Sequence, residues 1–109
     1  MKLLTKEVLE SLPPLYSQED KALDAVVPVK YFMPDGSFTW FASEYDPADR
    51  VFFGFVTSGL CPEGELGNFS LDDLESVKGA LGLGVERDLH WHPKTLAEVM
   101  AEVRRGIPA

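Results

Sequence analysis

The sequence predicts an α+β fold, in which an antiparallel β-meander of three to five strands packs with two or three short helices in a single compact domain, residues 1–109. Three observations lead to this prediction. The chain has 109 residues, which fits one ordinary domain. Segments rich in β-branched and aromatic residues are separated by turns in the middle of the chain. Helical patterns with capping residues lie near both ends.

Three segments carry helix signals, at residues 5–12, 70–78 and 95–105. Each begins at a residue whose side chain can accept a hydrogen bond from the first helical turn, namely Thr5, Ser70 and Thr95. Thr95 and Glu98 have the spacing of a capping box. We therefore expect a short helix at each position.

Four segments have strand composition, at residues 26–33, 38–45, 51–56 and 85–92, and Phe69 adds a short strand. Pro28 cannot donate to a strand partner, so its strand should lie at an edge or begin pairing after it. Residues 51–56 are apolar at successive positions, which predicts cover on both faces, by helices or by a partner subunit. Gly54 predicts a bulge or a close approach of another backbone.

The chain is acidic, with 10 Lys and Arg against 18 Asp and Glu and a net charge of −8. This balance argues against direct nucleic-acid binding, which depends on cationic side chains. Arg50 is the only base among eight carboxylates of the central region: Glu44, Asp46, Asp49, Glu63, Glu65, Asp72, Asp73 and Glu75. Gathered on one side, these acids would attract basic partners; the alternative is a solvated face that keeps the protein soluble.

The amino-terminal residues lack the apolar core of a secretory signal, and no apolar run is long enough to span a bilayer. The single cysteine, Cys61, excludes an intrachain disulfide and fits a reducing compartment. We therefore expect a cytoplasmic protein without a membrane association.

Two kinds of catalytic motif are missing from the sequence. There is no GxSxG nucleophile motif, and nothing around Cys61 marks it as an activated thiol. The glycines at 79, 82 and 84 lack both the lysine of a phosphate-binding loop and the spacing of a dinucleotide-binding turn. This segment reads as a flexible turn.

Residues 85–92 contain the one pattern suited to a metal ion. On a strand, Glu86, Asp88, His90 and His92 would share one face, and imidazole and carboxylate groups suit zinc, iron or manganese. The alternative is an amphipathic strand with one solvated face, because metal ligands normally come from separate elements. No other cofactor is indicated.

A second set of residues is aromatic and acidic. Alternation on the strand 38–45 would place Trp40 and Glu44 on one face and Tyr45 on the other. Exposed aromatic rings beside carboxylates would form a binding surface; the alternative is that all of them are core and that Arg50 pairs with Asp46 or Asp49. The candidate binding residues are Trp40, Glu44, Tyr45, Asp46, Arg50, Glu65, Glu86, Arg87 and Asp88.

Five segments resemble an uncharacterised bacterial family, domain of unknown function 2958. They are Leu12-Pro13-Pro14-Leu15-Tyr16, Phe38-Thr39-Trp40-Phe41 with Glu44-Tyr45-Asp46-Pro47, Phe52-Phe53-Gly54, Gly67-Asn68-Phe69-Ser70-Leu71-x-x-Leu74, and Val85-Glu86-Arg87-Asp88. The resemblance extends from about Leu4 to Leu96, and Asn68 departs from the aromatic residue expected there. It implies a small single-domain protein often carried on plasmids and other mobile elements, and it transfers no catalytic residue.

These observations favour a non-enzymatic accessory protein that binds another protein through an acidic surface, with homodimer formation as a further option. A second hypothesis is an inhibitor of a host defence nuclease or effector, whose carboxylates would occupy a nucleic-acid site. A third is a metal-assisted enzyme that uses the face of Glu86, Asp88, His90 and His92.

Overall fold

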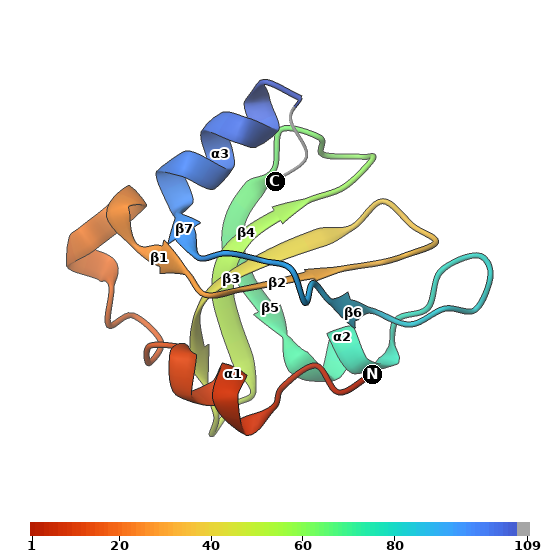
Figure 1. Ribbon diagram of the computed structural model, residues 1–109, viewed down its shortest axis with the longest axis horizontal. Helices are drawn as coiled ribbons and strands as arrows, with labels where there is room; N and C mark the ends of the chain where they lie inside the picture. The colour runs from red at the N-terminus through yellow and green to blue at the C-terminus, as the bar shows by residue number, and fades with distance from the viewer. Residues whose placement is uncertain (107–109) are drawn as a thin grey trace.

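The computed structural model describes residues 1–106 and centres on a five-stranded antiparallel sheet in the order β5-β4-β3-β2-β6 (Figure 1). A two-stranded sheet pairs β1 with β7. The strands are β1 Val26–Val27, β2 Val29–Phe32, β3 Thr39–Asp46, β4 Val51–Thr57, β5 Glu65–Ser70, β6 Glu86–Arg87 and β7 Lys94–Thr95. The helices are α1 Lys6–Ser11, the 3₁₀ helix η1 Glu19–Asp24, α2 Leu71–Ser76 and α3 Leu96–Arg104. The predicted α+β class with an antiparallel meander is confirmed.

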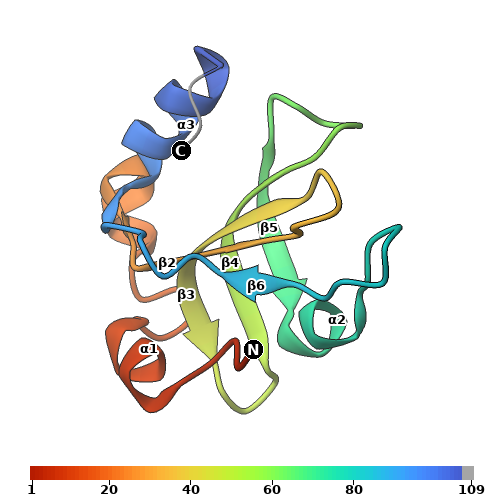
Figure 2. The ribbon, with the colours of Figure 1, turned by 45° about the vertical axis from the view of Figure 1, so that its right-hand side comes forward.

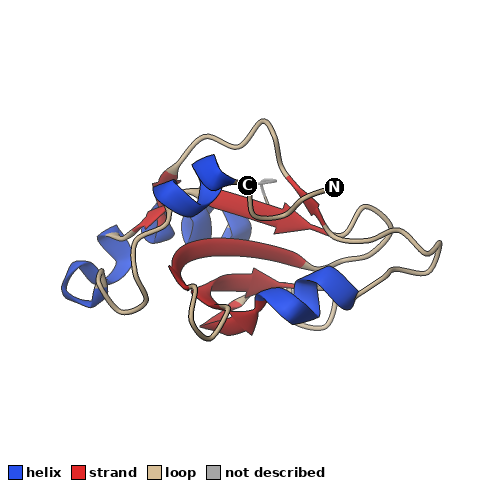
Figure 3. Ribbon diagram, turned by 90° about the horizontal axis from the view of Figure 1, so that it is seen from below, coloured by secondary structure: helices blue, strands red, loops and turns tan. Residues whose placement is uncertain are grey.

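Both faces of the central sheet are covered by the chain itself. On one face, Trp40, Tyr45 and Phe52 pack with residues of the amino-terminal segment and of α2. On the other face, Phe41 and Phe55 pack against residues that include Leu96 and Val99 of α3. Figures 2 and 3 show the helices on both sides of the sheet. The predicted cover over residues 51–56 is therefore confirmed, and it requires no partner subunit.

Gly54 brings two backbones into close contact at the centre of the sheet. It pairs with Ala42, and a Cβ atom at this position would overlap the carbonyl oxygen of Phe41. The predicted close approach is confirmed. The bulge lies opposite, in β3, where the pairing shifts between Ala42 and Glu44 and leaves Ser43 as the extra residue.

Pro28 divides the segment 26–33 into two strands. Val26 and Val27 pair with β7, whereas the pairing of β2 in the central sheet begins only at Val29. This agrees with the expectation that pairing starts after the proline, which has no N–H to donate.

The predicted strand 85–92 is wrong beyond Arg87. Glu86 and Arg87 pair with Phe32 and Tyr31, and pairing of this part of the chain resumes only at Lys94. Between them the chain bends, because the Asp88 side chain accepts the His90 N–H at 2.9 Å and the Trp91 N–H bonds to the Asp88 carbonyl at 3.3 Å. The Asp88 N–H still bonds to the Lys30 carbonyl at 2.9 Å, and the five residues 89–93 then lie opposite the two residues 28 and 29.

Two other elements differ from the prediction. Residues 19–24, expected as loop, form η1, and the short strand expected at Phe69 extends over all of β5. The three predicted helices are present, and Thr5, Ser70 and Thr95 cap them through their side chains. None of the helices within residues 1–106 is long and apolar enough to cross a membrane.

Candidate functional site

The candidate binding residues lie in separate places. Trp40 and Tyr45 are core side chains, with exposed fractions of 7 % and 3 %. Tyr45 packs on Phe52 with ring centroids 4.6 Å apart, and burial raises the pKa of its hydroxyl. The aromatic residues therefore belong to the core and do not form an exposed binding surface.

Glu86, Arg87 and Asp88 lie at the β6 edge, where Arg87 and Asp88 contact other parts of the chain. Arg87 donates to the Lys2 carbonyl at 2.6 Å, which ties the amino-terminal segment to this edge. Asp88 forms an ion pair with Lys30 at 3.6 Å.

The metal hypothesis loses its geometric basis. Because the chain leaves the sheet after Arg87, Glu86, Asp88, His90 and His92 do not share the face of one strand. Within residues 1–106, no three His, Cys, Asp or Glu side chains are grouped so as to hold a metal ion.

Part of the predicted acidic surface forms at the end of the β3–β4 hairpin. Arg50 donates to Asp72 at 2.8 Å and to Glu75 at 2.6 Å, which joins the hairpin to α2. The hydrogen bond with Asp72 raises the pKa of Arg50. The expected local pairing of Arg50 with Asp46 or Asp49 is wrong.

The acids of the central region therefore divide into three groups. Asp46, Asp49, Asp72, Asp73 and Glu75 belong to this end of the sheet, in or next to the β3–β4 turn and α2. Glu63 and Glu65 belong to the opposite end, because Glu65 pairs with Val56 at the far end of β4. Glu44 is buried.

The bulge at Ser43 determines where Glu44 points. Without the bulge, alternation would place Glu44 on the face of Trp40 and Ala42. The extra residue shifts the alternation, so that Tyr45 joins that face and Glu44 lies opposite Phe53 on the other. The predicted sharing of a face by Trp40 and Glu44 is wrong for this reason.

Glu44 holds the segment that precedes η1. Its two carboxylate oxygens accept the backbone N–H groups of Tyr16 at 2.7 Å and of Gln18 at 2.8 Å. Tyr16 has a φ of 67°, a left-handed conformation that costs energy for a residue with a side chain. The charge-assisted bonds to Glu44 help to offset that cost.

Gln18 connects the same segment to two strands. Its side-chain nitrogen donates to the Ser43 hydroxyl at 3.1 Å and to the Ser43 carbonyl at 3.2 Å, and its side-chain oxygen accepts the Val26 N–H at 3.2 Å. The Ser43 hydroxyl in turn donates to the Val26 carbonyl at 2.9 Å. Both polar side chains are thus occupied by structural bonds.

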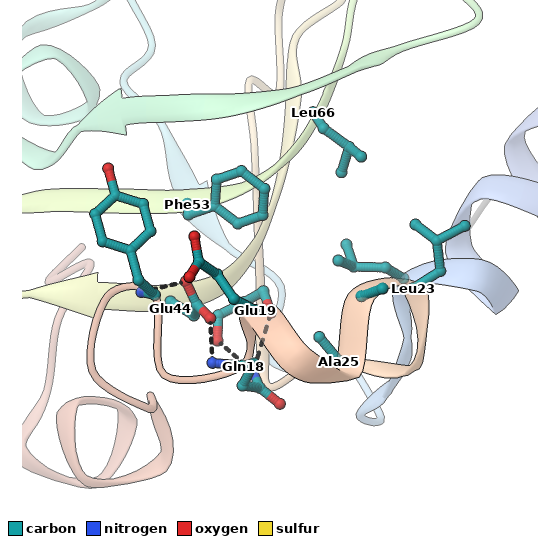
Figure 4. A pocket seen from close by; sticks show the side chains of 11 residues that line it. Gln18, Glu19, Leu23, Ala25, Glu44, Phe53 and Leu66 are labelled. Carbon is teal, nitrogen blue, oxygen red and sulfur yellow. Dashed lines mark hydrogen bonds between the residues drawn. The ribbon is translucent and has the colours of Figure 1, made fainter.

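These elements surround a pocket of about 270 Å³ (Figure 4). Its walls come from η1 and the segment before it, from β3, β4 and β5, and from the start of α3. The lining residues are Tyr16, Gln18, Glu19, Ala22, Leu23, Ala25, Ser43, Glu44, Phe53, Leu66 and Leu96. Tyr16, Leu23 and Leu66 are each more than 40 % exposed, so apolar surface continues from the pocket onto the exterior.

The pocket lining is mainly apolar and contains a few polar side chains. Its lining includes neither His nor Cys, and its one serine, Ser43, is engaged by Gln18 and Val26. Nucleophilic catalysis needs a nucleophile with a base in reach, and the lining offers no such pair. Mostly apolar walls with a few polar groups are typical of ligand sites.

A family model described as Protein of unknown function (DUF2958) matches residues 3–106, which is nearly the whole chain. The chain belongs to the DUF2958 family. The resemblance noted in the sequence is thereby confirmed. No curated protein and no solved structure matches the chain. The role of the pocket in this DUF2958 protein is therefore argued from its own residues.

Sequence reasoning identified Glu44 but missed the rest of the pocket. Residues 15–24 carried no helix signal, and Leu66 stood in an expected loop. The signal that was present is Glu44 itself, an acidic residue within a strand that contains three aromatic residues, because such an acid needs hydrogen-bond partners when it is buried.

Proposed function

We propose that this DUF2958 protein is a non-enzymatic accessory protein that binds a partner protein at the Glu44 pocket. The observation that carries the proposal is a mainly apolar pocket that is open to solvent between η1, the sheet and α3. Its volume of about 270 Å³ is smaller than the usual range for drug-sized ligands, so it suits a single side chain of a partner.

The surroundings of the pocket support a protein partner. Tyr16, Leu23 and Leu66 extend the apolar area beyond the pocket. Protein interfaces concentrate their binding energy where an anchoring side chain enters a well-packed pocket that neighbouring contacts shield from water. An apolar pocket with an apolar margin fits that arrangement.

Charge favours a basic partner. The η1 helix exposes Glu19, Asp20 and Asp24 against Lys21 alone, and the whole chain has a net charge of −8. Complementary charge accelerates association and makes it sensitive to salt. The family resemblance implies that such proteins are carried on bacterial mobile elements, so we propose a cytoplasmic bacterial partner.

A narrower candidate function is inhibition of a nucleic-acid-binding defence effector. The five carboxylates near Arg50 support it, because they give that end of the sheet the negative charge that such an effector binds. Binding that weakens strongly as salt rises would support this function, whereas binding that salt does not affect would exclude it.

Affinity capture with two tryptophan variants tests the main proposal. Leu66→Trp places an indole at the pocket, whereas Leu60→Trp adds the same group to a loop residue that is 97 % exposed and outside the pocket lining. The wild type and Leu60→Trp should recover the same stoichiometric partner, and Leu66→Trp should lose it. Equal recovery by all three proteins, or no partner in a bacterial host lysate, would contradict the proposal.

A further inference from the structure

The charges that line the pocket all have one sign. Glu19 and Glu44 are its two ionisable acids, and no Lys, Arg or His is among the lining residues. From this we infer that the occupant is a lysine or arginine side chain of the partner, with its alkyl stem against the apolar walls and its cationic group at Glu44. The inference rests on the proposed function and adds the chemistry of the anchoring residue.

Glu44 has the charge and the burial that this role needs. It is only 3 % exposed, and none of the ion pairs within residues 1–106 includes it. A carboxylate offers about four acceptor positions on its two oxygens. The N–H groups of Tyr16 and Gln18 use two of them and bring no full positive charge. A cation that enters the pocket therefore meets a negative charge that these two N–H groups do not neutralise.

The walls suit the stem of such a side chain. Phe53, Leu66 and Leu96 supply apolar surface beside the carboxylate. Lysine and arginine combine a flexible hydrocarbon stem with a charged end, and they bury the stem along apolar surface. A purely apolar side chain would fill the same walls but would leave Glu44 without a counter-charge.

The competing explanation is that Glu44 is structural only and serves to hold Tyr16 and Gln18 in place. The two explanations differ in a measurable way. If Glu44 only holds the backbone, the charge of an occupant does not affect its affinity. If Glu44 faces the occupant, a cationic group strengthens binding and the effect depends on that carboxylate.

Three small probes of similar size separate these cases. We would titrate n-pentylamine, n-pentanol and valerate into isotopically labelled protein and follow the backbone amide signals. The ammonium probe should bind about tenfold more tightly than the alcohol, because both can donate a hydrogen bond to the carboxylate but only the ammonium adds a positive charge to it. It should shift the amide signals of Tyr16 and Gln18, and valerate should not bind. Equal or tighter binding of pentanol, or no change at these amides, would overturn the inference.

Two variants test whether the pocket acids cause the tighter binding of pentylamine. Glu44→Gln should abolish the advantage of pentylamine over pentanol, and Glu19→Gln should reduce it. The control is Glu10→Gln on α1, which removes the same charge from an exposed position outside the pocket lining and should have no effect. If Glu44→Gln fails to fold, Glu19→Gln decides alone, because Glu19 is exposed on η1 and its replacement should not unfold the protein. An unchanged preference in that variant would then count against the inference.

A last comparison addresses the source of the cation. N-acetyl-lysine-N-methylamide carries the same ammonium group on a peptide backbone, and it should bind as tightly as pentylamine. If only the free amine binds, the pocket accepts a small organic amine and the assignment to a partner side chain is wrong. Should Leu66→Trp abolish partner capture while pentanol binds as well as pentylamine, the proposed function stands and this inference falls.

Discussion

The carboxylate of Glu44 accepts the backbone N–H of Gln18 at 2.8 Å, although 26 residues separate them in the sequence. This contact connects the central sheet to the segment that leads into η1, and it places a buried negative charge beside the pocket. The stability of the pocket and its proposed selectivity therefore depend on the same side chain.

Removing the Glu44 side chain should loosen the segment before η1. Glu44→Ala leaves the N–H groups of Tyr16 and Gln18 without their acceptor, which costs about 1–3 kcal/mol when such groups stay buried. We expect a lower free energy of unfolding in urea and faster hydrogen exchange at these two amides. Unchanged exchange would show that other contacts hold the segment.

The contact at Gly54 should tolerate no side chain. Gly54→Ala forces a methyl group into the carbonyl of Phe41, and we expect a loss of about 3 kcal/mol in the free energy of unfolding. Gly67→Ala is the matched control, because nothing lies within 4 Å of a Cβ atom at that position on β5. Its effect should stay within about 0.5 kcal/mol. Similar losses in both variants would contradict the assignment.

Alkaline pH should destabilise the protein through Tyr31. This side chain is fully buried and donates to the Leu3 carbonyl at 2.7 Å, and burial raises its pKa well above the ordinary value of 10.0. A raised pKa means that the folded state keeps the proton, so the stabilisation is complete below pH 10.0 and is lost as the pH rises above it. Urea unfolding between pH 8 and pH 11 measures the loss.

Tyr31→Phe is the control for this pH dependence. It removes the titrating hydroxyl, so the free energy of unfolding should fall less steeply at alkaline pH. At neutral pH the lost hydrogen bond should lower the free energy of unfolding by about 1 kcal/mol. A remaining decline is expected from Tyr45, whose pKa burial also raises. If the stability of Tyr31→Phe falls with pH as steeply as that of the wild type, groups other than Tyr31 cause the alkaline loss of stability.

The ion pairs of Arg50 should contribute only at low salt. Arg50, Asp72 and Glu75 are all well exposed, so water and ions screen their attraction. We expect Arg50→Gln to lower the urea midpoint slightly at low ionic strength and to match the wild type at high ionic strength. A difference that persists in high salt would indicate a role beyond charge.

The sequence predicted the parts of the fold that depend on local chemistry. Thr5, Ser70 and Thr95 were expected as helix caps, and each accepts a backbone N–H of its own first turn. The apolar run at residues 51–56 was expected to be covered on both faces, and Phe52 and Phe55 are buried in different clusters. Such features need no knowledge of a distant partner.

The features that were missed depend on distant partners. The face of Glu44 follows from the register between β3 and β4, which alternation along β3 alone does not reveal. The strand expected at residues 85–92 had suitable composition, but Pro28 stands opposite its later part and has no N–H to offer. The pocket was missed because its walls come from segments that the fold brings together.

The extra residue in β3 has a consequence for comparing members of the family. A relative lacking one residue at the position of Ser43 would pair without the bulge and would keep its acid opposite Phe53, on the face of the pocket. An alignment gap at this single position would therefore mark proteins that keep the pocket acid but lose the hydroxyl through which Gln18 and Val26 are joined.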